Sequence, residues 1–145
     1  MAARLQKEFN VEVVLTGGPK DVEVVQKVGT LAGGSLRTFI GLPLRQLAAL
    51  YAAAAVVVSN DAGSMHIAAA VGTPTIGLFG PGEEDIWFPY DPALGHKALR
   101  RDVPCHPCHL DLCTREGDGY MECMKLLTVD EVTGAVEGAL NRSIR

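Results

Sequence analysis

Apolar and polar residues alternate along this chain in blocks that predict strands followed by helices. Short apolar blocks have the length and composition of buried parallel strands, and they lie at residues 11–15, 36–40, 56–58 and 75–79. Segments with helical spacing or helix-forming composition lie at residues 2–9, 20–28, 43–51, 64–71 and 128–140. The last of them begins with a capping-box pattern, Thr128 at the cap and Glu131 three residues later, and has Val132, Val136 and Leu140 on its apolar face. This order of elements predicts the α/β class, with a doubly wound, mostly parallel sheet.

The clearest turn signal follows the third predicted strand. Residues 59–63 are turn formers, the small residues at 64–71 continue as a helix, and Gly72-Thr73-Pro74 ends that helix. Open α/β sheets bind ligands in such loops, at the carboxyl ends of their strands. The free N–H groups in the first turn of the helix favour an anion. The stretch therefore predicts a phosphate-binding site.

Composition and charge narrow the class of protein. The chain has 145 residues, of which 48% are apolar and 21% charged, as expected for a globular domain with its own core. A net charge of -4 argues against a general nucleic-acid binder, which would be basic. No apolar run approaches the roughly 20 residues of a membrane span. The N-terminal stretch is too short and charged for a signal peptide, so we expect a cytoplasmic protein.

The residues of the predicted phosphate loop also carry a family resemblance. The string Asp61-Ala62-Gly63-Ser64-Met65-His66, followed by an Ala-rich helix, Gly72-Thr73-Pro74 and Phe79-Gly80-Pro81, resembles the donor-site signature of the lipopolysaccharide heptosyltransferase family, glycosyltransferase family 9. The resemblance covers nearly the whole chain but only the C-terminal half of such an enzyme. It implies that residues 1–145 are the Rossmann-like, nucleotide-sugar-binding half of a glycosyltransferase B fold, without the N-terminal acceptor domain.

The resemblance implies a donor site built on this loop. Gly63 would let a phosphate approach the backbone, and the N–H groups of Gly63, Ser64 and Met65 would donate to the diphosphate. His66 would hold a phosphate or a sugar hydroxyl, although a lone helical histidine is more often structural. Asp61 would orient the sugar, and its alternative role is a helix N-terminal cap.

Three other turns would contribute to the same site. Gly17 and Gly18 would form a second side of the nucleotide site, or only a tight strand-to-helix turn. Leu42 lies where the family places the adenine. The alternative to this binding role is plain strand-to-helix packing. Gly80 would close over the donor. An acid near the start of the second helix, Asp21 or Glu23, would contact the ribose.

The implied reaction moves heptose from ADP-heptose to the inner core of lipopolysaccharide. No cofactor is implied, and no metal ligand or catalytic residue is assigned here, because the family's general base lies in the missing domain. We therefore expect this chain alone to bind donor weakly and to lack transferase activity. The acceptor would be bound through the missing domain, and the full-length protein would associate peripherally with the inner membrane. No nucleic-acid partner is expected.

All the cysteines of the chain lie in one segment, residues 102–125. Cys105, Cys108, Cys113 and Cys123 are compatible with tetrahedral zinc, although only one C-x-x-C pair is present. A disulfide is disfavoured in a reducing cytoplasm, and unlinked buried thiols are the third alternative. This segment supports a second functional hypothesis, a non-catalytic, metal-stabilised interaction domain. A third is another glycosyltransferase B enzyme, such as a sugar-nucleotide epimerase.

Overall fold

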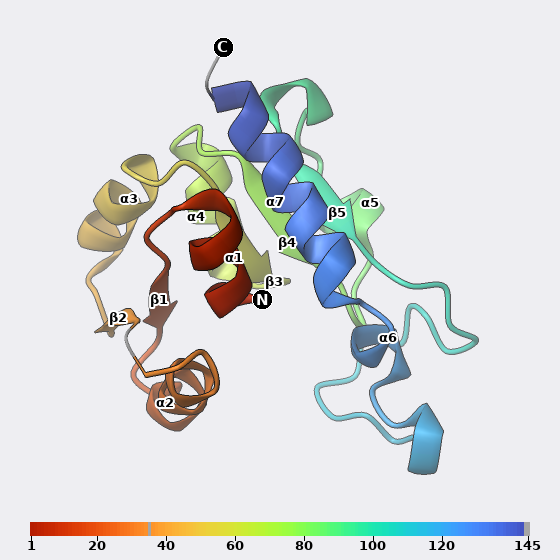
Figure 1. Ribbon diagram of the computed structural model, residues 1–145. Coiled ribbons are helices and arrows are strands. Elements are labelled where there is room, and N and C mark those ends of the chain that lie inside the picture. The colour runs from red at the N-terminus through yellow and green to blue at the C-terminus, as the bar shows by residue number, and fades with distance from the viewer. Residues whose placement is uncertain (35, 144–145) are drawn as a thin grey trace. The chain divides into compact units, whose positions relative to one another are not determined.

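The computed structural model describes residues 1–34 and 36–143, and the chain divides between Leu47 and Ala48 into two compact units. Within the described residues the strands are β1 (Val14–Gly17), β2 (Arg37–Ile40), β3 (Val57–Asn60), β4 (Thr75–Leu78) and β5 (Lys97–Leu99). The helices are α1 (Ala2–Phe9), α2 (Val22–Leu31), α3 (Leu44–Ala52), α4 (Gly63–Ala70), α5 (Glu84–Trp87), α6 (Glu122–Lys125) and α7 (Val129–Ser143), with short 3-10 helices η1 (Pro92–Leu94) and η2 (Gly117–Gly119) (Figure 1).

The predicted parallel α/β class is confirmed. The strands pair in two parallel sheets, β1 with β2 and β3-β4-β5 in chain order. The stretch between the predicted helix at 20–28 and the predicted strand at 36–40 was expected to be a connector, but α2 continues into it as far as Leu31. Ser35 of this stretch lies outside the described residues. In the part of the chain that the structure describes, no helix is both long and apolar enough to cross a membrane.

In the first unit, α2 connects the paired strands β1 and β2 and packs against β1. Leu15 of β1 lies opposite Thr38 of β2. The first strand was expected to start at residue 11, but it starts at Val14, because Asn10 adopts the left-handed conformation (φ 52°) that ends α1 and redirects the chain. The second helix starts two residues later than expected, because Asp21 closes the preceding turn by accepting a hydrogen bond from the Gly18 N–H at 2.8 Å.

In the second unit, α4 connects β3 to β4 and packs against both strands. The buried cluster of this unit contains Met65 from α4, Phe79 from the end of β4, and Phe88. Met65 and Phe79 have no exposed surface. Strand β5 was not predicted, because its three residues contain no apolar block and become a strand only through pairing with β4.

Helix α7 packs against β4 (Figure 1). The predicted cap is confirmed, because the Glu131 N–H donates to the Thr128 hydroxyl at 3.2 Å. The Glu131 carboxylate pairs with the guanidinium of Arg101 and therefore links the start of the helix to the segment after β5. Val132 and Val136 are buried, as their helical spacing predicted.

We predict that Gly77→Ala destabilises the second unit. A Cβ at Gly77 would lie 2.9 Å from Met65 Sδ and from ring carbons of Phe79 and Phe88, all within the buried cluster. Overpacking of this kind costs about 1–3 kcal/mol. Urea unfolding followed by circular dichroism measures the loss in free energy of unfolding.

Gly138→Ala is the matched control, because a Cβ there meets nothing within 4 Å on the exposed side of α7. It should be neutral or stabilising by up to about 1 kcal/mol, as alanine favours helix. Equal free energies of unfolding for the two variants would show that the buried cluster has room for a Cβ at position 77.

Candidate functional site

The loop between β3 and α4 presents two backbone donors. Its N-cap residue is Ala62, in extended conformation (φ -161°, ψ 167°) and without a side-chain cap. The Met65 N–H donates to the Ala62 carbonyl at 3.0 Å. Among the described residues, the N–H groups of Gly63 and Ser64 enter no backbone hydrogen bond, as expected for a first helical turn. These two groups are the ones free to meet an anion.

Asp61 does not cap the helix. The N-cap position belongs to Ala62, so the structural alternative considered for this carboxylate is wrong. The Asp61 N–H donates to the Leu78 carbonyl at 3.0 Å, which joins the loop to the end of β4. The side chain is exposed, with its Oδ2 in the space that a Cβ of residue 82 would occupy. Asp61 is therefore held by its backbone, and its carboxylate remains available at the surface.

The Ser64 hydroxyl already has a partner. Ser59 Oγ donates to the Asn60 carbonyl at 2.8 Å and lies 2.8 Å from Ser64 Oγ. Because the Ser59 proton is used, the Ser64 hydroxyl donates in this second contact. A ligand would therefore accept a hydrogen bond from the Ser64 backbone N–H. The Ser64 hydroxyl instead links the first turn of α4 to the end of β3.

Met65 anchors α4 in the core of the second unit. Its side chain is fully buried, and its N–H is engaged with Ala62. A role for this N–H in donor binding, which the sequence predicted, would require a ligand to share or replace that hydrogen bond.

His66 follows one residue later and is half-buried. Its Nδ1 lies 2.5 Å from the hydroxyl of Tyr90, and the two rings meet edge to face with centroids 6.1 Å apart. Burial raises the pKa of Tyr90, so its hydroxyl stays protonated at neutral pH. Tyr90 lies 24 residues further along the chain and was not predicted as part of the site.

The loop after β4 reaches Asp61 through Gly82. A Cβ at Gly82 would lie 2.3 Å from Asp61 Oδ2, so only glycine permits this approach. Gly80, the residue that the sequence proposed, is buried, and a Cβ there would lie 2.9 Å from Met124 Sδ. Gly80 therefore has a packing role in the structure, and its predicted contact with a donor remains a prediction.

The cysteine-rich segment holds this loop in place. The N–H groups of Cys108 and His109 both donate to the Pro81 carbonyl, at 3.2 and 3.1 Å. His106 Nε2 lies 2.8 Å from the Gly82 carbonyl and must carry a proton, because a carbonyl only accepts. The segment thus positions the residues that border Asp61, a role that its sequence did not indicate.

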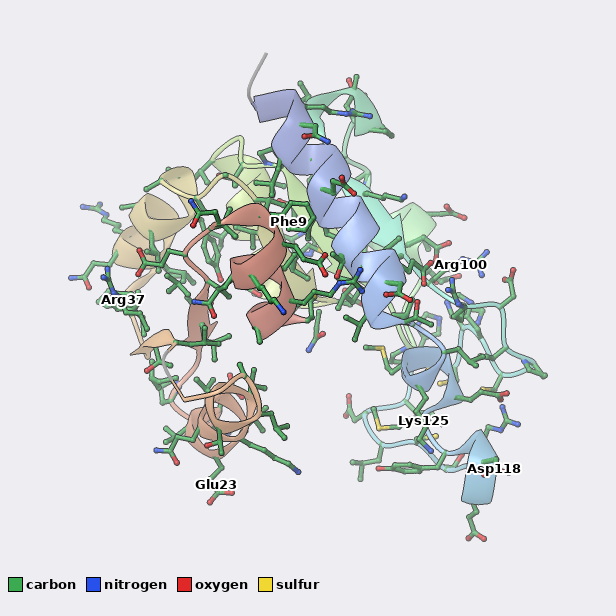
Figure 2. The ribbon with its side chains drawn as sticks, viewed as in Figure 1. Phe9, Glu23, Arg37, Arg100, Asp118 and Lys125 are labelled. Atoms are coloured by element: carbon green, nitrogen blue, oxygen red, sulfur yellow. The ribbon has the colours of Figure 1, made fainter. Side chains whose placement is uncertain are left out.

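The four cysteines are free thiols, all half-buried. Figure 2 shows sulfur atoms of this segment gathered around α6, near the labelled Lys125. Met121 N–H donates to Cys113 Sγ at 3.3 Å, and an Arg115 guanidinium nitrogen lies 3.7 Å from Cys105 Sγ. Within residues 1–34 and 36–143, no group of three or more His, Cys, Asp or Glu side chains is placed to hold a metal ion. The metal-stabilised alternative therefore gains no support from the described residues.

The remaining predicted residues lie in the first unit, Met1–Leu47. A Cβ at Gly17 would lie 2.9 Å from Val25 Cγ2, so glycine lets α2 approach β1. The N–H of Gly18 is taken by Asp21. Gly41 has φ +66° and donates to the Gly17 carbonyl at 2.8 Å, which leaves the half-buried Leu42 just after the paired strand ends. Donor contacts for Gly17, Gly18 and Leu42 remain predictions.

The second unit has the topology of an open parallel α/β protein, in which a helix N-terminus with unengaged N–H groups follows the carboxyl end of a parallel strand. The model of glycosyltransferase family 9 (heptosyltransferase) matches residues 1–117, and the chain belongs to this family. The resemblance stated from the loop residues is thereby confirmed.

Curated relatives include lipopolysaccharide heptosyltransferase 2 of Escherichia coli (strain K12), 37% identical over 92 residues, which are 60% of this chain and 25% of the relative. Lipopolysaccharide heptosyltransferase 1 of Pseudomonas aeruginosa is 35% identical over 91 residues, 61% of this chain and 25% of the relative. The matched part thus spans about a quarter of the length of these relatives.

The fold has a solved counterpart, the glycosyl transferase family 9 protein from Veillonella parvula DSM 2008. The TM-score is 0.76, the alignment covers 97% of this chain and 40% of that chain, and the identity is 24%. At this identity the likeness supports the fold alone.

We predict that Gly82→Ala moves the Asp61 carboxylate without unfolding the protein. The new Cβ would overlap Asp61 Oδ2, and an exposed aspartate can rotate away. Two-dimensional NMR should show shifts at Asp61 and its loop neighbours. Gly134→Ala, where a Cβ meets nothing within 4 Å, is the control and should leave these signals unchanged. Identical spectra for the two variants would contradict the contact.

We also predict unequal reactivity among the thiols. Hydrogen bonds from the backbone N–H groups of Met121 and Arg115 lower the pKa of Cys113, whereas burial raises the pKa of Cys123. At pH 7 Cys113 therefore carries more thiolate and reacts faster. Limiting iodoacetamide with peptide mass spectrometry should label Cys113 before Cys123, and the difference should vanish in denaturant. Equal labelling of the folded protein would refute this order.

Proposed function

We propose that this chain is the donor-binding half of a heptosyltransferase and that it binds ADP-heptose through its diphosphate at the β3–α4 loop. The observation that carries this proposal is the pair of unengaged N–H groups at Gly63 and Ser64, with His66 one turn into the same helix. Family membership and the names of the relatives support the sugar class.

In this mechanism the loop stabilises the departing nucleoside diphosphate. Negative charge builds on the phosphate oxygens as the bond between the heptose and the diphosphate breaks. The Gly63 and Ser64 N–H groups are already fixed in the first turn of α4, so they meet this charge with little reorganisation. His66 adds a side-chain donor. The loss of one such preorganised donor typically costs about 10²–10³ in rate.

Asp61 has a different task in the proposal. A carboxylate would repel a diphosphate, so the exposed Asp61 side chain is better suited to accept hydrogen bonds from sugar hydroxyls. Gly82 and the cysteine-rich segment hold the neighbouring backbone against it. Gly17, Gly18 and Leu42 are proposed contacts of the nucleoside.

The transfer step itself extends beyond these residues. We propose that the acceptor is the inner core of lipopolysaccharide, reached at the cytoplasmic face of the inner membrane. The general base would come from the acceptor-binding part of the enzyme, as the matched region is about a quarter of its relatives. The 145-residue chain is then expected to bind donor nucleotide weakly and not to transfer heptose.

Calorimetric titration with ADP and with UDP tests the proposal. We expect ADP to bind more tightly than UDP, and His66→Ala to weaken ADP binding about 10-fold or more, because a hydrogen bond to a charged group is lost. His109→Ala is the matched control, as its side chain is 54% exposed and pairs with Glu83 at 3.3 Å. Absence of binding at millimolar ADP, or equal effects of the two variants, would count against this site.

A further inference from the structure

The contact between His66 and Tyr90 determines which nitrogen of the histidine can face a ligand. The Tyr90 hydroxyl lies 2.5 Å from Nδ1, so Nδ1 is occupied and Nε2 is the nitrogen left for other partners. Two arrangements fit that distance. Either the hydroxyl donates to an unprotonated Nδ1, or a protonated Nδ1 donates to the phenol oxygen. The first leaves a proton on Nε2, and the second leaves a lone pair there.

Hydrogen-bond accounting favours the first arrangement. Tyr90 keeps its proton at neutral pH, because burial raises its pKa. Across the described part of the chain, its hydroxyl has no hydrogen-bond partner other than His66. If Nδ1 were the donor, the hydroxyl of the half-buried Tyr90 would keep a proton with no acceptor among the described residues, which is the less favourable arrangement. When Tyr90 donates, the proton and Nδ1 are both satisfied.

The position of the Tyr90 ring is set by the core. Its ring packs edge to face on Phe88, with centroids 4.9 Å apart, and Phe88 packs in the same way on Phe79 at 5.9 Å. On another side it lies 5.4 Å from the buried ring of His96. The Tyr90 N–H also donates to the Phe88 carbonyl at 2.8 Å. The hydroxyl is therefore held in place before any ligand binds.

We propose that Tyr90 is a positioning residue that fixes His66 in the tautomer with its proton on Nε2. A ligand at the β3–α4 loop then meets an N–H donor instead of a lone pair that would repel phosphate oxygens. The part of this inference that concerns the ligand rests on the proposed function, whereas the tautomer itself is a property of the free protein.

The first test is spectroscopic and needs no ligand. Long-range ¹H–¹⁵N spectra of the ¹⁵N-labelled chain at pH 8 distinguish protonated from unprotonated ring nitrogens. We expect His66 to show a protonated Nε2 and an unprotonated, hydrogen-bonded Nδ1. Tyr90→Phe keeps the ring and removes the hydroxyl, so its Nδ1 signal should move toward an unbonded, tautomer-averaged value. A proton on Nδ1 in the wild type, or unchanged signals in Tyr90→Phe, would overturn the proposal.

The second test is a double-mutant cycle with ADP as the probe. Tyr90→Phe should weaken ADP binding about threefold to tenfold, the range of one neutral hydrogen bond. In a His66→Ala background the same change should have no further effect, because Tyr90 acts through His66. Equal weakening in both backgrounds would show that Tyr90 acts directly or only through the fold, and would refute the positioning role.

Tyr120→Phe is the matched control, since Tyr120 is exposed and its ring lies under the Lys125 ammonium at 5.5 Å. It should alter neither the His66 signals nor ADP binding, and thermal unfolding of each variant checks the fold. A wild-type chain that binds no ADP would refute the proposed function, while the spectra of the free protein would still decide whether Tyr90 sets the tautomer.

Discussion

The packing of Met65 between α4 and β4 is the constraint on which the loop depends. The side chain is fully buried against Phe79 and Phe88, and the absence of a side chain at Gly77 makes room for all three. Because Met65 lies in the first turn of α4, its burial fixes how far the helix N-terminus stands beyond β3. The orientation of the Gly63 and Ser64 N–H groups follows from that packing, and not from a contact with the ligand.

A second set of contacts extends this rigidity across the site. The Pro81 and Gly82 carbonyls are held by the cysteine-rich segment, and the Gly82 backbone lies against Asp61. Met124 packs over Gly80 in the same region. This gives the cysteine-rich segment a structural role beside the proposed site, whose proposed chemistry involves no thiol. It positions backbone that borders the ligand loop, and its own thiols remain unlinked.

The proposed chemistry uses groups that are satisfied or fixed before a ligand arrives. Ser59 and Ser64 hold the first turn, Tyr90 holds His66, and the helix dipole adds a favourable field for an anion. Preorganised donors of this kind stabilise developing charge without reorganisation during the reaction. A glycosyltransferase needs this at the diphosphate, because the leaving group gains charge as the sugar departs.

Local sequence determined the order of the first four strands and of the five longer helices, the Thr128 cap and the loop at 61–66, because turn residues, caps and apolar blocks act over a few neighbouring positions. It missed the three-residue β5, which exists only as an edge partner of β4. The tertiary structure alone decided that Ala62, and not Asp61, occupies the N-cap, that the Met65 N–H is engaged, and that Gly82 borders Asp61. It also decided that Tyr90 meets His66 and that His106 meets Gly82. These outcomes depend on contacts between residues far apart in the chain and on how each donor is shared, which local pattern does not specify.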